Sequence, residues 1–285
     1  MKVSILYGSA IGFYALLLFA VERFYPLRAP TRQLLGRLTV NLTFAAIAFA
    51  VVSTLVRPAA EWTLGWSAAD NFGLVRLMAL PAWLQAVLAF ILMDLTFYWW
   101  HRANHRIPLL WRFHNVHHFD PDLDLSTAFR FHFVELAFSA GFRILQVGLI
   151  GISAWTYVVY EVIFQAGTLF HHSNIRLPIH IERMLVAVFV TPRMHGIHHS
   201  QVPMETNSNY STVFSFWDRL HRTLGLNIPQ SSIQIGVPGY VAPDDNRLTK
   251  ALIAPFYPQR NYWRRSDGSV PQRQDSEGGK GHLAQ

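Results

Sequence analysis

The stretch Trp99–His118, WWHRANHRIPLLWRFHNVHH, decides how this chain can fold. It holds five of the chain's 14 histidines, and twelve of the 14 lie between residues 101 and 199. Hydrophobic residues make up 51% of the chain and charged residues only 14%, whereas soluble domains have about 25% charged residues. Imidazoles gather in this way when they share metal ions, because they are good ligands for iron, zinc, copper and nickel. The sequence therefore predicts a polyhistidine metal centre in a protein with much lipid-facing surface.

The composition excludes several kinds of site. The chain has no cysteine, so it has no disulfides, thiolate zinc sites, iron–sulfur clusters or cysteine nucleophiles. Its net charge of +7 could indicate a nucleic-acid partner. However, the Lys and Arg residues lie beside apolar segments and in the C-terminal tail, as anionic lipid headgroups favour. We therefore expect a membrane protein without a nucleic-acid partner.

Five apolar segments are candidate membrane spans, because a helix needs about 20 residues to cross a bilayer. Three are clear, and they cover residues 3–21, 38–56 and 77–100. Two weaker ones, 133–152 and 154–170, could cross twice or form a hairpin that dips into the membrane. We predict an all-α, multi-pass transmembrane helix bundle, in which residues 57–76 form a mixed, aromatic connection.

The arginines indicate an orientation for this bundle. They are dense in residues 23–37, directly after the first span, which marks that end as cytoplasmic. Counting spans from there places all histidine groups and the C-terminus on the cytoplasmic side, as a histidine-rich cap. We expect residues 1–262 to form one membrane-embedded domain with a histidine-motif core at about 94–223. Residues 263–285 are polar and are expected to be a disordered tail.

Three motifs place histidines at helical spacing, since residues three and four apart share a helix face. They are HxxxH at His101 and His105, and HxxHH at His114, His117 and His118 and again at His195, His198 and His199. Each HxxHH motif is expected to present its three imidazoles on one face. Eight imidazoles exceed what one four- to six-coordinate ion can use, so we predict two ions. A protonated histidine cluster that senses pH is one alternative, but it would crowd like charges together. A histidine-rich tract that sequesters metal is another, but such tracts have low sequence complexity and this sequence does not.

Carboxylates often fix the orientation of ligand histidines by accepting a hydrogen bond from the second ring nitrogen. Asp94 lies seven residues before His101 on the same helix face, inside an apolar span where an acid needs a partner. We predict that it orients a ligand, with a helix cap or local salt bridge as the alternative. Weaker candidates of the same kind are Glu135, Glu161 and Asp218. Asp122, in the loop after the second motif, is expected to be solvated.

The chain resembles the fatty acid hydroxylase or sterol desaturase superfamily of integral-membrane di-iron oxidases, and looks similar to bacterial sterol desaturase family members. The resemblance is carried by DLTFYWWHRANH, LLWRFHNVHHFDPDLDLSTAFRFHFVE, FHHSNIRLP, TPRMHGIHHS and NYSTVFSFWDRL, from Asp94 to Leu220. It implies that the eight motif histidines are the metal ligands. The family's His-Ser/Ala-Asn element falls on residues 172–174, which implies His172 as a ninth ligand and places Asn174 beside it.

A second family element, Arg-x-His-Pro-x-Glu, is matched less closely. It falls on Arg130, His132 and Glu135, with Phe133 where the family has proline. The resemblance thus makes His132 a candidate tenth ligand. His171 stands where many members have glutamine, so it is expected to be a neighbour of the site and not a ligand.

The resemblance also implies a reaction. Two iron ions, or zinc in their place, would use O₂ as co-substrate and external electrons to hydroxylate or desaturate a C–H bond of a lipid, whether fatty acyl, sterol or related. Hydroxylation, desaturation and C–C cleavage are not separated by the ligand sequence. We recognise no reductase, haem-binding or flavin-binding segment, so a separate electron-transfer protein is expected. The implied location is a bacterial inner membrane.

Two other functions are compatible with a histidine-rich membrane protein. One is a zinc-dependent membrane hydrolase, which would need a general base such as Glu135. The other is a metal-binding or transport protein, which would call for polar residues through the spans. The first two predicted spans contain no charged residue, which disfavours transport.

Overall fold

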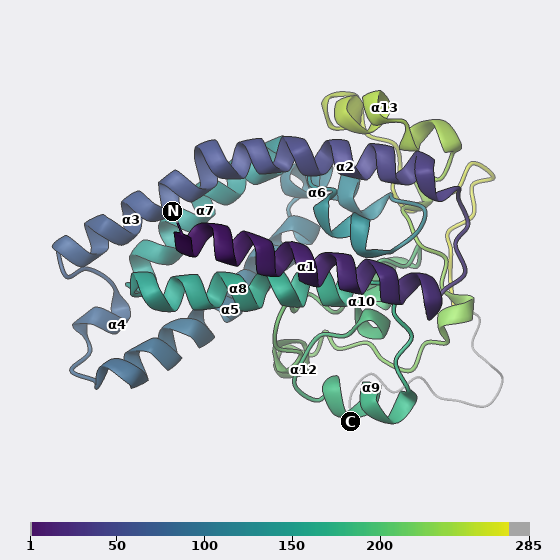
Figure 1. Cartoon of the computed structure of the whole chain (residues 1–285). Coiled ribbons are helices and arrows are strands. Elements are labelled where there is room, and N and C mark those ends of the chain that lie inside the picture. Colours follow the sequence, from purple (N-terminus) through teal and green to yellow (C-terminus); the bar gives the residue numbers. More distant parts are fainter. Residues whose placement is uncertain (1, 274–285) are drawn as a thin grey trace.

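Long apolar runs without an internal proline form the body of the protein. The structure, a computed structural model, describes residues 2–273. The long helices are α1 (Lys2–Phe24), α2 (Leu34–Val51), α5 (Ala82–Arg106), α7 (Phe133–Ile150) and α8 (Ala154–His172). They lie side by side in Figure 1, where α1 packs against α8, and both α2 and α5 pack against α7. Within residues 2–273 there is no strand, only isolated bridges, and the predicted all-α fold is confirmed.

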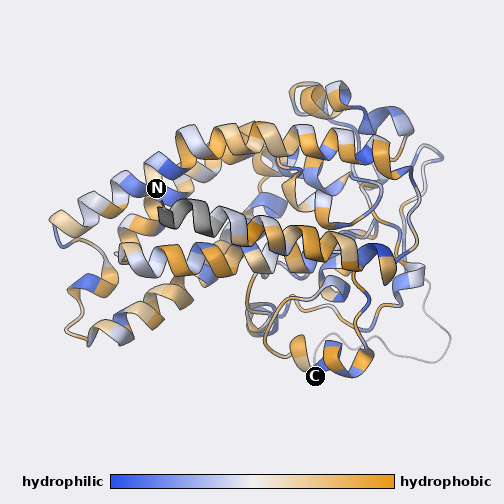
Figure 2. Ribbon diagram, viewed as in Figure 1, coloured by the Kyte–Doolittle hydropathy of each residue, from blue (hydrophilic) through white to orange (hydrophobic). Residues whose placement is uncertain are grey.

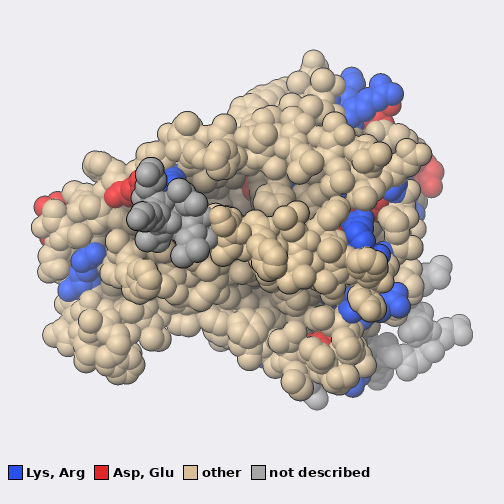
Figure 3. Space-filling view, viewed as in Figure 1, with Lys and Arg blue, Asp and Glu red and all other residues tan. Residues whose placement is uncertain are grey.

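Three helical stretches are long and apolar enough to cross a membrane, namely Leu34–Leu77, Ala82–Arg106 and Phe133–Ile150. Apolar residues run along the long helices in Figure 2. In Figure 3 the charged side chains gather at the two ends of the molecule and leave a nearly uncharged band between them. Leucines on these helices are strongly exposed, such as Leu16 at 71% and Leu145 at 61%, as lipid-facing positions are. The predicted multi-pass helix bundle is therefore supported, although the predicted first and fifth spans, α1 and α8, are not among these three.

The segment 57–76, predicted to be a connection, is helical instead. After α2 the chain passes through a π-helical turn at Val52–Val56 into α3 (Arg57–Ala69), and the short α4 (Leu74–Leu77) follows. Pro58 lies in the first turn of α3, where its missing N–H costs least, and the π turn precedes it. The mixed composition reflects a helix that packs along α7 and exposes tryptophans on its other side.

Short helices form a cap at one end of the long ones (Figure 1). They are α6 (Pro108–His118), α9 (Ile179–Leu185), α10 (Pro192–His198), α11 (Pro203–Thr206), α12 (Phe216–Leu220) and α13 (Leu248–Ile253). α6 and α10 begin with a proline, which suits the first helical position. Only Ile107 separates α5 from α6, and it is extended because a proline follows it. This sharp turn brings the first two histidine motifs to face each other.

A buried ionic network fastens the cap to α2. Arg37 binds Asp120 through Nε at 2.9 Å and Asp124 through Nη1 at 2.7 Å. Asp122, predicted to be solvated, is buried instead and accepts a hydrogen bond from the backbone N–H of Thr31 at 2.8 Å. Because the acidic loop follows directly on the second histidine motif, the network holds the end of α6 in place.

Part of the predicted polar tail packs back on the cap. Trp263 stacks on Trp111 with ring centroids 5.7 Å apart, and Arg273 pairs with Glu205 at 2.6 Å. Residues 274–285, the rest of that tail, lie outside the described residues.

Candidate metal centre

Nine buried histidines converge in the cap as two groups, and within each group one ring nitrogen of every member lies within 4.8 Å of the others. The first group, which we call the five-histidine group, contains His101, His105, His114, His118 and His198. The second, the four-histidine group, contains His117, His172, His195 and His199. The structure thus brings together all eight motif histidines and His172.

Adjacent histidines of each HxxHH motif belong to different groups. His114 and His118 lie one helical turn apart in the five-histidine group, whereas His117 reaches the other group. In the later motif, His195 and His199 share the four-histidine group and His198 belongs to the first. Neighbouring side chains on a helix diverge by about 100°, so a helix between the two groups serves both. The expectation that each motif presents three imidazoles on one face was wrong for this reason.

Hydrogen bonds fix the orientation of four of these rings. Each places Nδ1 at 2.7–2.8 Å from an oxygen: His101 to the carbonyl of Tyr210, His114 to Oε1 of Glu135, His172 to the carbonyl of Thr168 and His198 to the carbonyl of Ser208. A carbonyl or carboxylate can only accept, so Nδ1 carries the proton. Nε2 is then left with a free lone pair, as a metal ligand requires.

The four-histidine group has the nitrogen spacing of a coordination shell. The Nε2 atoms of His117 and His172, of His172 and His195, and of His195 and His199 are each 3.1 Å apart. Two nitrogens that bind one ion at about 2.0–2.1 Å, roughly at right angles, are separated by about 3 Å. His172 has its proton on Nδ1, so its Nε2 can only accept. These distances fit a shared ion better than a chain of imidazole hydrogen bonds.

The five-histidine group leaves buried nitrogens without a hydrogen-bond partner. Both ring nitrogens of His105 and of His118 are in this position, as is Nε2 of His114 and of His198. A buried polar atom without a partner costs about 1–3 kcal/mol, so such a concentration needs a ligand to satisfy it. A cation bound by neutral imidazoles fits this donor set, and zinc or iron suits it better than an oxygen-seeking ion.

Burial keeps at least three of these rings uncharged. Burial, and then the neighbouring imidazoles, hold the pKa of His118, His198 and His199 well below the ordinary histidine value. The rings are therefore neutral at pH 7 and do not have to lose a proton before they bind a metal. A cluster of protonated, pH-sensing histidines does not fit this environment.

Glu135 is the predicted carboxylate that contacts a candidate ligand directly. Its Oε1 accepts the Nδ1 proton of His114, on the side of the ring away from Nε2. A carboxylate in this place orients the imidazole and raises its basicity. This contact assigns Glu135 to the orientation of a ligand ring, which does not favour the hydrolase alternative.

The other predicted partners lie further from the rings. Asp94 accepts hydrogen bonds from Nε1 of Trp217 at 2.8 Å and from the backbone of Phe214 at 3.1 Å, and contacts no ligand histidine. It therefore joins α5 to the segment before α12 and does not orient a ligand as predicted, because its side chain turns to α12 and away from His101. Glu161 pairs with Arg143 at 3.0 Å, also away from both groups.

Two predicted residues act through the backbone. Asp218 accepts hydrogen bonds from the N–H groups of Tyr210 and Ser211 at 2.8 and 2.9 Å, which fixes the turn whose carbonyl receives the proton of His101. Asn174 binds the peptide groups of Arg28 through its amide. Each therefore supports a segment next to a candidate ligand without touching the ligand itself.

His132, the candidate tenth ligand, lies outside both groups. Its Nδ1 accepts a hydrogen bond from the N–H of Val134 and caps α7, and its Nε2 lies 3.1 Å from the carbonyl of Leu252. Both ring nitrogens are therefore used elsewhere. His171 is a neighbour, as expected: its Nδ1 lies 3.1 Å from the carbonyl of Thr212, and its ring centroid is 4.2 Å from that of His195.

Sequence reasoning missed most of the groups that accept the Nδ1 protons of the ligand rings. Three of the four acceptors of Nδ1 protons are backbone carbonyls, at Thr168, Ser208 and Tyr210. Every residue has a carbonyl, so no residue type marks these positions. The ring of Tyr210 also packs 5.2 Å from that of His105, and only the aromatic character of this segment gave a signal.

Comparison with known proteins agrees with this geometry. Residues 86–223 match the family model described as fatty acid hydroxylase, and this range contains all nine clustered histidines. The chain contains a fatty acid hydroxylase domain. The resemblance seen in the sequence is thereby confirmed. No solved structure matches the chain.

Relatives of the fatty acid hydroxylase domain act on different lipids, as their names state. Ornithine lipid hydroxylase OlsE of Rhizobium tropici is 32% identical over 57% of this chain and 48% of its own length. Alkylglycerol monooxygenase of Xenopus tropicalis is 29% identical over 48% of this chain and 29% of its own. Human cholesterol 25-hydroxylase is 29% identical over 47% of this chain and 48% of its own. The chain thus spans less than half the length of each of these relatives.

Proposed function

We propose that this protein is an integral-membrane, O₂-dependent hydroxylase or desaturase of a lipid C–H bond, with an iron ion in each histidine group. The observation that carries the proposal is the convergence of nine buried histidines into two groups inside a fatty acid hydroxylase domain. The nine histidines would hold the two ions, while His132 would not. When bound, the ions would supply the O₂ activation and hydrogen abstraction that no protein acid or base provides.

An apolar cavity supports a lipid substrate. It has a volume of about 340 Å³ and lies between α1, α8 and α9, where its walls include Tyr14, Gly167, Phe170 and Val213. Thr212 also lines it, and the carbonyl of Thr212 is within hydrogen-bond distance of His171, whose ring contacts that of His195. His171 thus connects the cavity wall to the four-histidine group. We infer that this cavity holds part of an apolar lipid chain.

The membrane and the electron donor complete the proposal. The histidine groups lie at the ends of α5 and α8 and on the short helices of the cap, and charged side chains gather at the ends of the molecule in Figure 3. We therefore infer that the reaction takes place where lipid meets water. We propose that this end faces the cytoplasm of a bacterial cell, in the inner membrane, because of the arginines after α1. The electrons would come from a separate protein.

Metal content and oxygen incorporation test this function together. Tag-free protein, purified in detergent, should contain two iron ions per chain. Cells that express it should accumulate a lipid that carries ¹⁸O after growth under ¹⁸O₂, or a lipid with a new double bond, and cells that express His117→Ala should not. Zinc without iron, together with lipid turnover in the absence of O₂, would contradict the proposal in favour of a hydrolase.

A further inference from the structure

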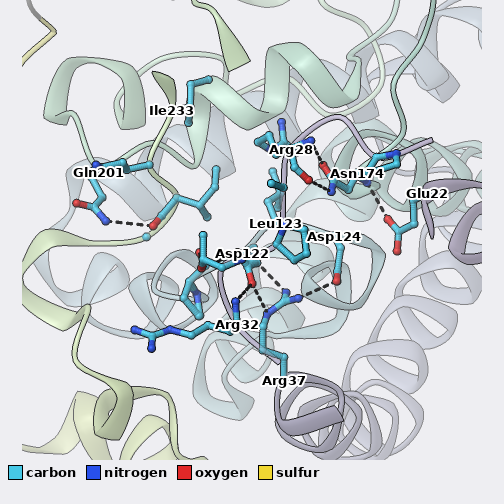
Figure 4. A pocket seen from close by; sticks show the side chains of 18 of the residues that line it. Glu22, Arg28, Arg32, Arg37, Asp122, Leu123, Asp124, Asn174, Gln201 and Ile233 are labelled. Carbon is cyan, nitrogen blue, oxygen red and sulfur yellow. Dashed lines mark hydrogen bonds and ion pairs between the residues drawn. The ribbon is translucent and has the colours of Figure 1, made fainter. Parts of the chain in front are cut away.

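Two cavities of the protein differ in the character of their walls. The larger has a volume of about 570 Å³, and charged side chains such as Glu22, Arg28 and Asp124 line it (Figure 4). The smaller is the apolar cavity of about 340 Å³ described above, and none of its described lining residues is charged. Charged walls suit water, whereas uncharged walls suit lipid. The segments that form the smaller cavity are therefore candidates for contact with the membrane.

The segment 179–189, which begins with α9, forms part of this apolar wall and carries an exposed apolar surface. Four of its apolar side chains are between 42% and 70% exposed, and we call them the α9 patch: Ile179, Met184, Val188 and Phe189. Arg176 and Arg183 are exposed beside the patch, whereas the acid of this segment, Glu182, is buried. Single exposed apolar residues are common on soluble surfaces, but a group of them marks an interaction site. Exposed apolar and basic residues together are typical of segments that lie on anionic lipid.

Two contacts of Phe189 show that the end of this segment reaches back along the long helices. Phe189 lines the apolar cavity together with Ile163, which lies nine residues before His172 in α8. Its ring also stacks on Phe214 at 5.9 Å, and the ring of Phe214 lies 6.0 Å from that of Phe90. Phe90 belongs to α5, a helix that could cross a membrane, and lies eleven residues before the first motif histidine. At 1.5 Å per residue, Ile163 and Phe90 lie roughly 13 and 16 Å from the histidines along their helices.

The backbone of the segment is hydrogen-bonded as a lipid environment requires. The carbonyl of Val186 accepts a hydrogen bond from the hydroxyl of Ser215 at 2.7 Å, and that of Val188 accepts one from the N–H of Ser215 at 2.9 Å. Nη1 of Arg219 donates to the carbonyl of Ala187 at 3.3 Å. Backbone outside a helix is tolerated at membrane depth only where protein groups take the place of water in this way.

We propose that the α9 patch is immersed in the membrane, with residues 186–189 beside the acyl chains and the exposed Arg176 and Arg183 among the headgroups. Lipid is the occupant that fits, because the patch adjoins the apolar surfaces of α5 and α8 and because its arginines complement anionic headgroups. The cap would then be a part of the membrane-embedded body and not a lid held above it. This inference concerns the surface of the molecule and does not depend on the reaction proposed above.

The position of the patch also determines where the apolar cavity opens. Ile163 and Phe189 both line the cavity, and they are 39% and 42% exposed. The cavity therefore reaches the molecular surface between them. With the α9 patch in the membrane, this opening faces the bilayer, so that an apolar molecule can enter the cavity from the leaflet without passing through water.

A single fluorophore can report the surroundings of the patch, because the chain has no cysteine of its own. Val188→Cys, labelled with the fluorophore NBD on the metal-loaded protein, is placed in nanodiscs of phosphatidylcholine and phosphatidylglycerol. Spin-labelled lipid quenches the fluorophore from the bilayer, and iodide quenches it from water. Leu145→Cys, at an exposed leucine of α7, is the lipid reference, and Asp267→Cys, at an exposed polar position, is the water reference. The ratio of lipid to iodide quenching at Val188→Cys should approach that at Leu145→Cys and exceed that at Asp267→Cys about tenfold.

The same measurement on Met184→Cys decides the matter if Val188→Cys does not fold. A ratio at the patch equal to that at Asp267→Cys would place the patch in water and overturn the inference. Protection from both quenchers would show that a second copy of the chain or another protein covers the patch, and would overturn it as well. A low ratio at Leu145→Cys would instead overturn the membrane-embedded bundle, and the proposed function with it, so the two failures are distinguishable.

Discussion

Nδ1 of His114 lies 2.7 Å from Oε1 of Glu135, and this pair connects α6 to α7 behind the five-histidine group. The carboxylate fixes both the tautomer and the direction of the ring. The same pair explains why an acid 21 residues away from a ligand belongs to the metal centre.

Replacing Glu135 should increase the rate at which the protein releases its metal. We expect Glu135→Ala to release iron to a chelator about 10- to 100-fold faster than the wild type, as for other residues that orient a ligand. Glu135→Gln keeps an oxygen acceptor and should lose less. Stopped-flow mixing with a coloured chelator measures the rate, and Glu61→Gln, at an exposed glutamate of α3, is the control. Equal release rates for Glu135→Ala and wild type would remove Glu135 from the centre.

The two histidines at positions 117 and 132 should behave oppositely. His117→Ala removes a nitrogen 3.1 Å from that of His172, so bound iron and lipid turnover should fall together. His132→Ala removes only a helix cap and a contact with Leu252, so iron content should stay at the wild-type level. Elemental analysis of both variants measures this difference. Full iron content in His117→Ala, or loss of iron in His132→Ala with a normal melting temperature, would contradict the assignment.

Asp94 should matter for stability and not for metal retention. It lies in α5 and accepts a hydrogen bond from Trp217 Nε1 at 2.8 Å. We expect Asp94→Asn to lower the free energy of unfolding by about 1–3 kcal/mol, because a charged acceptor in an apolar setting is lost. Its iron release rate should equal that of the wild type. Thermal unfolding and chelator kinetics on one preparation test both statements, and faster iron release would return Asp94 to the metal centre.

These cases show how far the sequence could predict the site. The clustered histidines could be found because imidazole is rare in apolar helices and the motifs repeat. The division of His117 and His118 between two groups could not, since it depends on where α6 lies between its neighbours. Asp94 was misassigned because helical periodicity fixes a face, whereas the partner on that face belongs to a segment about 120 residues later. Likewise, the helical nature of residues 57–69 depends on packing against α7, which local composition does not reveal.

The apolar cavity predicts a change in lipid selectivity. Gly167 lines it, and an added Cβ there would make only ordinary contacts, 3.6 Å from the carbonyl of Thr212. Gly167→Leu should therefore fold but fill the cavity, and kcat/KM should fall about tenfold or more for long-chain lipids relative to short-chain ones. Gly141→Leu, where an added Cβ meets nothing within 4 Å, is the matched control. An unchanged ratio between chain lengths in Gly167→Leu would mean that the substrate lies elsewhere.

Metal-free protein should lose stability as the solution is acidified. Burial lowers the pKa of His118, His198 and His199 in the fold, whereas the unfolded chain protonates these residues below about pH 6.5. The unfolded state therefore binds more protons, and the melting temperature should fall between about pH 7.5 and 5.5. Iron-loaded protein should change less, because the ions compete with protons for the same nitrogens. A metal-free melting temperature that is flat over this interval would show that the rings are not neutral in the fold.

The sharing of α6 and α10 between the two groups has a consequence for assembly. His117 and His118 are joined by one peptide bond, as are His198 and His199, yet each pair would serve two ions. The first ion to arrive would immobilise both helical turns and thereby bring most of the remaining ligands into register. The second ion would then bind ligands that are already ordered, so its binding would cost less conformational entropy. Maturation would accordingly be cooperative, so that half-filled molecules are scarce and the protein acquires its metal in pairs.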